Sequence, residues 1–216
     1  LHNLSFIEGL ELMPGNRILV SKRNMIIPQV EENLDRGDFS MEALVPSLCP
    51  CCGYQTIIHT TQKRIYGELK LTKTLFCHNP NCASQNLRKF VHFVGKKAMD
   101  IEGLGSAIVE GLIEKGYISS PADIYYLTLE ELKGLWKKGD VAAKKLLSAI
   151  EASKSQDLSR LIFALGIRQV GAKAGKTLAA AFGSMDALME AGLEELTEVP
   201  DVGEITALSL LDWFAQ

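Results

Sequence analysis

Two pairs of cysteines constrain what this chain can fold into more than any other feature of its sequence. Cys49 and Cys52 lie in the run C-P-C-C-G, and Cys77 and Cys82 lie in the run C-H-N-P-N-C. The pairs are roughly 25 residues apart, so two short loops can present four thiolates to one tetrahedral ion. The sequence therefore predicts a small module around a structural Zn²⁺ held by these four cysteines.

Two alternatives exist for these cysteines. Disulfide bonds would leave one of the five cysteines unpaired, and neither a signal peptide nor an apolar run of transmembrane length is visible. A cytoplasmic protein with reduced thiols and no membrane partner is therefore expected.

The second alternative is Cys51, which also forms a short chelating loop with Cys49. Cys52 is preferred, because two intervening residues let backbone N–H groups point at sulfur and Gly53 follows where the turn must reverse.

Charge is distributed unevenly along the chain. The 216 residues carry a formal net charge of −3. Residues 1–53 hold 4 basic and 7 acidic side chains, residues 54–97 hold 8 and 1, and residues 98–216 hold 11 and 18. Aromatic residues are interleaved with the charges of the cationic middle segment. A solvated surface is one interpretation, but so one-sided a bias favours a surface for a polyanion such as DNA.

The C-terminal part contains an internal repeat. It aligns on Gly105, Gly139, Gly171 and Gly203, in steps of 34, 32 and 32 residues. An aliphatic residue stands four positions before each glycine, a small or apolar residue four positions after it, and a leucine seven positions after it. These residues are Ile101, Val109 and Leu112, then Leu135, Ala143 and Leu146, then Ile167, Gly175 and Leu178, then Val199, Ala207 and Leu210. The spacing predicts, four times, a helix, a tight turn and a second helix with an apolar stripe.

Each predicted turn is a candidate phosphate site. Backbone N–H groups at the start of the second helix can bind a phosphate oxygen, and such a contact reads no base. Basic residues flank the second and third turns, whereas acidic residues around the first and fourth predict weaker contacts or contacts through the main chain only. The candidate DNA-binding residues are Gly103, Gly105, Lys137, Gly139, Arg168, Gln169, Gly171, Lys173, Lys176 and Gly203. If only one such repeat were present, the preferred interpretation would be a tight turn in a helical solenoid rather than a phosphate site.

Residues 171–177, G-A-K-A-G-K-T, look like a nucleotide-binding P-loop. The pattern G-x-x-x-x-G-K-[ST] requires its first glycine at position 170, where Val170 stands, and no strand is expected before it. A helix with small residues packed against a neighbour is predicted instead.

The first 45 residues have a different pattern. Arg17–Arg23 is strand-like, and Met25–Pro28 is an apolar run that ends at a strand breaker. Two or three strands cannot bury a face by themselves, so the chain is expected to begin partway through a β domain. The predicted fold class is mainly α. Four helix-hairpin-helix repeats are expected in residues 85–216, after a four-cysteine zinc finger in 46–84 and a partial β segment in 1–45.

The order of the short motifs resembles the C-terminal half of the NAD-dependent DNA ligases of bacteria, over nearly all 216 residues. The matching stretches are Leu1–Asn3, Arg17–Pro28, the two cysteine runs, His92–Val94, Met99–Gly105, Pro121–Tyr125, Phe163–Arg168 and Phe182–Ser184. Each motif alone is weak, but their collinear order is specific. The resemblance implies the end of an OB-fold, a zinc finger, and a domain of four helix-hairpin-helix motifs that grips nicked duplex DNA.

The resemblance also implies a longer parent protein. In the family an earlier adenylation domain carries a nucleophilic lysine in a K-x-D-G motif, which does not occur in this chain. The chain alone is therefore expected not to ligate, and NAD and Mg²⁺ would act only through the preceding part. Its expected role is to position nicked DNA in replication and repair. The first glycine of the family's hairpin turns is replaced in this chain at three positions, by Lys137, Gln169 and Asp201. These replacements are also compatible with a divergent paralogue of the family.

Two other functions stay open on the sequence. One is a stand-alone DNA-binding protein of repair without ligase activity, which the partial β segment disfavours. The other is a scaffold whose zinc knot and repeats bind another protein. Salt dependence separates the scaffold from a DNA-binding protein, because phosphate contacts make affinity fall steeply with ionic strength.

Overall fold

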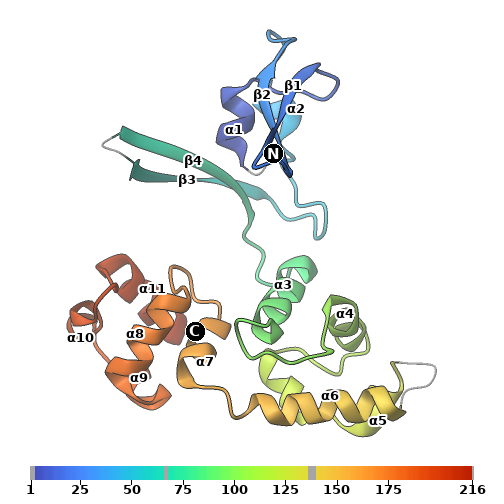
Figure 1. Cartoon of the computed structure of the whole chain (residues 1–216), viewed down its shortest axis with the longest axis vertical. Helices are drawn as coiled ribbons and strands as arrows, with labels where there is room; N and C mark the ends of the chain where they lie inside the picture. The colour runs from blue at the N-terminus through green and yellow to red at the C-terminus, as the bar shows by residue number, and fades with distance from the viewer. Residues whose placement is uncertain (1–2, 66–67, 136–139, 216) are drawn as a thin grey trace. The chain divides into compact units, whose positions relative to one another are not determined.

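The computed structural model describes residues 3–65, 68–135 and 140–215, and these form two compact units, residues 1–83 and 84–216 (Figure 1). The first unit contains α1 (Leu4–Gly9), β1 (Ile18–Arg23), β2 (Ile27–Asn33), α2 (Met41–Leu44), β3 (Thr56–Ile65) and β4 (Glu68–Cys77). The second contains α3 (Ala83–Val94), α4 (Ser106–Glu114), the 3₁₀ helix η1 (Pro121–Tyr126), α5 (Leu129–Lys133), α6 (Asp140–Ser153), α7 (Leu158–Ala164), α8 (Ala172–Phe182), α9 (Met185–Glu190), α10 (Leu193–Glu198) and α11 (Glu204–Phe214). The mainly α fold class is confirmed.

In the first unit, β1 and β2 form a two-stranded antiparallel ribbon. The turn between them uses Asn24 and Met25, which both have positive φ angles, of 50° and 62°. The apolar run expected at Met25–Pro28 therefore forms part of this turn and the start of β2, and its side chains are largely exposed. A two-stranded ribbon has no second layer on which to bury such residues.

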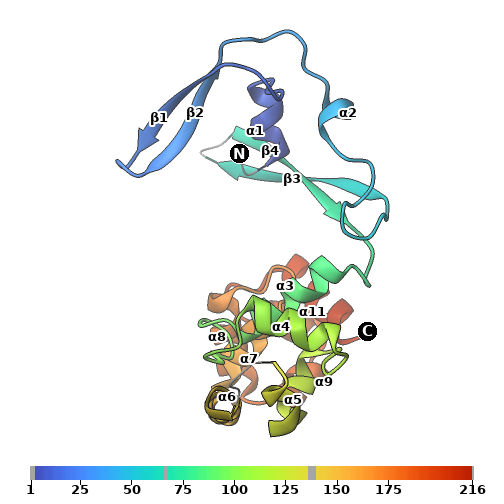
Figure 2. The same cartoon turned by 90° about the vertical axis from the view of Figure 1, so that its right-hand side faces the viewer.

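The second ribbon, β3 with β4, was not predicted from the sequence. Its antiparallel register pairs Thr56 with Cys77 at one end and Ile65 with Glu68 at the other. Helix α1 lies against β4, as Figure 2 shows, and the Nζ atom of Lys73 lies 2.7 Å from a carboxylate oxygen of Glu8. The hydroxyl of Ser5 also accepts the backbone N–H of Lys73, at 2.7 Å.

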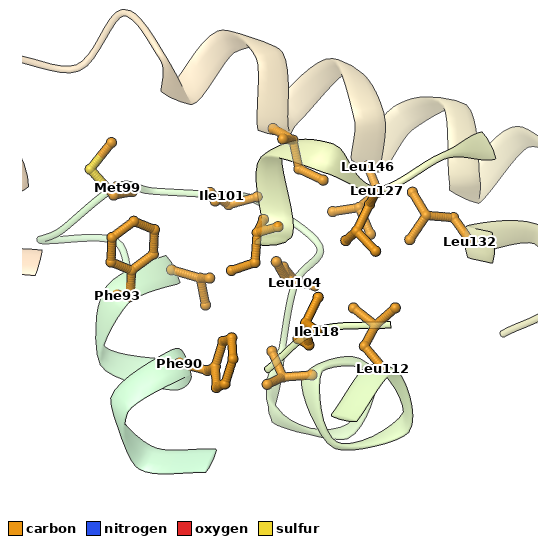
Figure 3. Packing of buried hydrophobic residues seen from close by; sticks show 14 of the residues in the cluster. Phe90, Phe93, Met99, Ile101, Leu104, Leu112, Ile118, Leu127, Leu132 and Leu146 are labelled. Carbon is orange, nitrogen blue, oxygen red and sulfur yellow. The ribbon is translucent and has the colours of Figure 1, made fainter. Parts of the chain in front are cut away.

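The second unit has two hydrophobic cores. One joins α3, α4, η1, α5 and α6, and Figure 3 shows its side chains directed toward one another, among them Phe90, Leu112 and Leu146. The other joins α7 to α11 around Leu178, Leu196 and Leu210. In Figure 1, α3–α6 gather on one side of the unit and α8–α11 on the other, with α7 between them. The first core contains the first two repeats, and the second core contains the last two.

The packing follows the predicted repeat. The leucines seven positions after the repeat glycines are at most 2% exposed, and Val109, Ala143 and Ala207, four positions after, are 0% exposed. The aliphatic residues four positions before are buried at Ile101, Ile167 and Val199, and Leu135 packs partly buried against the first core. The apolar stripe read from the sequence is therefore the core of this unit.

Residues 171–177 are not a P-loop. Helix α8 begins at Ala172, after helix α7 and the turn that follows it rather than after a strand. At Gly175 a Cβ atom would lie 2.8 Å from the carbonyl oxygen of Ser159. The glycine therefore allows α7 and α8 to approach each other closely, as expected for a helix with small residues against its neighbour.

Among the described residues, no helix combines the length and the apolar character needed to cross a bilayer.

Candidate nucleic-acid interface and metal centre

The first cysteine loop is closed by its own backbone. The N–H of Cys49 donates to the carbonyl of Tyr54 at 2.7 Å, and the N–H of Gly53 donates to the carbonyl of Cys49 at 2.8 Å. Gly53 has a φ angle of 69°, which a residue with a Cβ atom rarely adopts. Cys49 and Cys52 are thus held on one tight turn that leads into β3.

The second loop leaves β4 at Cys77, the last residue of that strand. Asn79 organises this loop, because its side-chain oxygen accepts the N–H of Asn81 at 3.0 Å and its carbonyl accepts the N–H of Cys82 at 3.1 Å. Since Thr56 pairs with Cys77 across the ribbon, the β3–β4 register delivers the second loop to the first.

The two loops bring four sulfur atoms together. The Sγ atoms of Cys49, Cys52, Cys77 and Cys82 all lie within 4.8 Å of one another, and those of Cys52 and Cys77 are 3.5 Å apart. A tetrahedral Zn²⁺ with four thiolates requires sulfur separations of about 3.8 Å. The donor set and its spacing therefore fit a metal ion. Cys51 is exposed and lies outside the cluster.

The surroundings of the cluster shift the pKa values of two of its thiols. The pKa of Cys52 is lowered to about 6, because hydrogen bonds from the Asn79 side chain and the backbone of Tyr54 favour the thiolate. A backbone hydrogen bond at Asn79 lowers the pKa of Cys77, but desolvation and the neighbouring thiols Cys52 and Cys49 outweigh it and raise the value to about 11. In this cluster one thiol loses its proton easily, and the negative charge then makes the next thiol harder to deprotonate. A bound dication would offset this repulsion between thiolates.

The described hairpin turns share one backbone geometry. Gly105, Gly171 and Gly203 are the N-caps of α4, α8 and α11, with φ angles of −77°, −86° and −85° and ψ angles of 172°, 176° and 171°. None of the three provides a side-chain hydrogen bond to its helix, and a Cβ atom at any of them would meet no atom of the described residues within 4 Å. These glycines leave open space at helix starts, where the first backbone N–H groups have no partner within the helix.

A left-handed residue precedes each of these N-caps by two positions. Gly103, Gln169 and Asp201 have φ angles of 89°, 66° and 66°. Gln169 and Asp201 carry a Cβ atom, so the left-handed conformation costs each of them about 1–2 kcal/mol of conformational free energy, a cost that glycine avoids. The left-handed turn is thus kept where the residue is not glycine. Lys137 and Gly139, the corresponding residues of the second hairpin, lie outside the described residues.

Basic side chains surround the third turn. Arg168, Lys173 and Lys176 are all exposed. The Nζ atom of Lys173 also lies 2.9 Å from both carboxylate oxygens of Asp201 in the fourth turn. In the first pair of hairpins, Lys145 similarly lies 3.6 Å from Glu102. Acidic residues of one hairpin thus neutralise lysines of its partner.

The cationic segment of the sequence is divided between the two units. Lys63, Arg64, Lys70 and Lys73 belong to the first unit, and Lys73 is paired with Glu8. Arg88, Lys89, Lys96 and Lys97 belong to the second unit, where they add positive charge on and after α3. The sequence alone could not reveal this division, because the segment is continuous in the chain.

Sequence reasoning missed the contacts that join the two hairpin pairs. Arg160 of α7 donates from Nε to the carbonyl of Ala98 at 2.7 Å and from Nη2 to the carbonyl of Lys96 at 2.6 Å. The Nε2 atom of His92 in α3 lies 2.8 Å from the carbonyl of Phe163. These partners are more than 60 residues apart, and no local pattern in the sequence indicates them.

Comparison with known proteins adds two findings. Residues 160–216, which contain the third and fourth hairpins, match the family model described as "Helix-hairpin-helix motif". The whole chain is similar to proteins named DNA ligase, at 41% identity in Thermoanaerobacter sp. (strain X514) and 38% in Desulforamulus reducens, each over 100% of this chain. The relative from Chlorobium phaeovibrioides is 39% identical over 99% of this chain. The chain spans 31% of the length of each of these relatives.

Proposed function

We propose that this chain, which is homologous along its whole length to about a third of proteins named DNA ligase, is the DNA-clamping segment of an NAD-dependent ligase. In that protein it would hold a nicked duplex for an adenylation domain that precedes it. The parent reaction would join a 3′-hydroxyl to a 5′-phosphate in replication and repair, in the cytoplasm. The NAD and Mg²⁺ of that reaction would act through the other part of the protein.

The observation that carries the proposal is the open geometry of the N-cap glycines. Gly105, Gly171 and Gly203 have the same backbone conformation, and nothing in the described part of the chain occupies the space that a Cβ atom would fill. A phosphate oxygen that enters this space would meet backbone N–H groups and the positive end of a helix dipole. Main-chain contacts of this kind bind any DNA sequence, as the sealing of nicks requires.

The cysteine cluster has a structural role in the proposal. Cys49, Cys52, Cys77 and Cys82 would fill the four positions of a bound Zn²⁺, which would leave none for a substrate. A bound Zn²⁺ would supply a cross-link between the β3–β4 ribbon and the chain that enters α3. The ribbon on its own buries little surface, so the four thiolates are what hold its base together.

The proposal is tested by a Gly171→Ala variant. Its Cβ atom meets open space in the free chain, so the stability should fall by only about 0.5 kcal/mol, the difference between glycine and alanine at an N-cap. Affinity for a nicked duplex, measured by fluorescence anisotropy, should fall at least tenfold, because the methyl group takes the space of the phosphate. Gly9→Ala is the matched control, since its Cβ atom also meets nothing and it lies outside the hairpins.

Two results would contradict the proposal. Equal DNA affinity of the Gly171→Ala variant and the unchanged chain would remove the third hairpin from the interface. An affinity that does not change between 50 and 200 mM salt would exclude phosphate contacts in general and would favour a protein-binding scaffold.

A further inference from the structure

Two histidine side chains meet at the end of the β3–β4 ribbon that carries the cysteines. The Nε2 atom of His59 on β3 lies 2.9 Å from the Nε2 atom of His78, and the planes of the two rings differ by 14°. His78 directly follows Cys77 and is exposed, whereas His59 is half-buried. At this distance only one proton fits between the two nitrogens, so at least one imidazole presents an unprotonated lone pair to the other.

The fold holds both rings in place before any ligand binds. His59 pairs with Thr74 across the ribbon, and Phe76, two residues further along β4, lies on the same face. The ring of Phe76 packs edge-on against that of His59, with the ring centroids 5.2 Å apart and an angle of 83° between the planes. His78 lies in the loop that Asn79 organises. This preorganisation reduces the side-chain freedom that a chelating pair loses on binding.

Paired imidazole nitrogens are ligands for divalent transition metals. Metal–nitrogen bonds are about 2.0–2.1 Å long, so two nitrogens 2.9 Å apart subtend an angle of about 90° at a shared ion. A tetrahedral ion would separate them by about 3.4 Å. The right angle is typical of the square-planar or tetragonal sites of Ni²⁺ and Cu²⁺, and both ions bind nitrogen ligands more tightly than the earlier divalent metals of their row. The neighbouring cysteine cluster offers thiolates instead, which suit Zn²⁺.

We propose that His59 and His78 form a second metal site, separate from the cysteine cluster, for a divalent cation of the Ni²⁺ and Cu²⁺ class. The ion takes the place of the shared proton, which passes to solvent, and the two rings turn slightly so that both lone pairs converge on it. Among the described residues no third histidine, cysteine or carboxylate joins the pair, so water fills the remaining coordination positions and the ion exchanges readily.

A bound ion would connect β3 to the loop that follows β4, next to the connection made by the cysteine cluster. The ribbon should therefore be more stable with both ions than with zinc alone, because a ligand that binds only the folded state stabilises it. This inference goes beyond the proposed function and does not rest on it, since neither histidine is among the predicted DNA contacts.

The experiment titrates Ni²⁺ into the untagged 216-residue chain after it has been loaded with one equivalent of Zn²⁺. The background carries Cys51→Ser and His2→Gln, which remove the thiol outside the cysteine cluster and the histidine next to the first residue of the sequence. Isothermal titration calorimetry should find about one Ni²⁺ site per chain, and elemental analysis should still find about one zinc. His59→Gln and His78→Gln should each weaken Ni²⁺ binding at least about tenfold without loss of zinc, because either change leaves a single imidazole and removes the chelate.

His92→Gln is the matched control, because His92 lies in the second unit and its Nε2 atom donates to the carbonyl of Phe163. Its Ni²⁺ affinity should equal that of the background. The inference is wrong if the background binds no Ni²⁺, or if either single variant binds it as tightly as the background does. Release of zinc by Ni²⁺ would also overturn it, since the ion would then occupy the thiolates. None of these results bears on the proposed function, which is tested by duplex affinity.

Discussion

At the scale of single residues, the five cysteines differ in their surroundings. Cys82 is 1% exposed and Cys49 is 9% exposed, whereas Cys51 is an exposed residue. The sequence allows either Cys51 or Cys52 to form a short chelating loop with Cys49, and it favours Cys52. The structure brings Cys52 to the cluster, where the Asn79 side chain supports its thiolate.

This difference predicts opposite outcomes for two similar substitutions. A Cys82→Ser variant should lose bound zinc, because an exchange of sulfur for a hydroxyl removes one of four thiolates at a buried position. A Cys51→Ser variant should keep about one zinc per chain. Elemental analysis of the reduced, purified proteins measures both. Equal zinc content in the two variants, or none in the unchanged chain, would contradict the four-thiolate site.

At the scale of secondary-structure elements, the closest helix contact lies between α7 and α8. The backbone of α8 approaches α7 at Gly175, where a Cβ atom would lie 2.8 Å from the carbonyl oxygen of Ser159 and 3.6 Å from the backbone nitrogen of Phe163. The clash would be with backbone, which cannot move aside as a flexible side chain can. The third hairpin therefore depends on a glycine at this position.

A Gly175→Ala variant should consequently be destabilised by about 1–3 kcal/mol, the usual cost of overpacking, although alanine is the better helix former. Chemical denaturation followed by circular dichroism would measure this. Gly171→Ala in the same chain segment is the control, because its Cβ atom meets open space. A Gly175→Ala variant as stable as the control would show that α7 and α8 can separate without cost.

The β3–β4 ribbon shows the limit of sequence prediction at this scale. Its strands contain several β-branched residues, Thr56, Ile57, Ile58, Thr60 and Thr61, which is a signal for a strand. The charges and cysteines of the same segment are stronger signals, and they indicate a surface and a metal site rather than a pair of strands. Where its side chains are described, the ribbon has only exposed or partly buried residues, so it also lacks the clear apolar alternation by which strands are usually found.

At the scale of the second unit, α7 connects the two hairpin pairs. Arg160 donates to two carbonyls of the loop before α4 and lies 3.8 Å from Asp100, and His92 reaches Phe163 from α3. Phe163 and Ala164 also pack against the first core, while Ile162 belongs to the second. The separation of the hairpin turns of the two pairs is therefore set by contacts that lie outside the proposed phosphate sites.

An Arg160→Met variant should test this connection. The substitution removes the donor that binds the carbonyls of Lys96 and Ala98. The free energy of unfolding of the unit should fall by about 1–2 kcal/mol, which is the contribution of a hydrogen bond from a charged group, reduced because Arg160 is partly exposed. Duplex affinity should fall as well, although the variant removes no predicted DNA contact. Denaturation and anisotropy measure the two effects. Arg36→Met, at an exposed arginine of the first unit outside the cationic segment, is the control, and identical behaviour of the two variants would show that the pairs are not held by Arg160.

The sequence by itself determined the features that repeat or chelate locally. Helical spacing is enough to identify a buried stripe, so residues such as Leu112, Leu146, Leu178 and Leu210 could be assigned to a core. Cysteine spacing is likewise enough to predict that two loops meet, because the chemistry of a tetrahedral ion allows few other arrangements.

Tertiary structure alone decided which residues meet across long separations. The pairing of Lys173 with Asp201, the contacts of Arg160, and the division of the cationic segment between two units depend on how the chain folds back on itself. Side chains of the same charge and type occur throughout the sequence, and a hydrogen bond to a backbone carbonyl has no residue-specific signature. The open space before the N-cap glycines is also a tertiary fact, since it exists only because no other part of the described chain fills it.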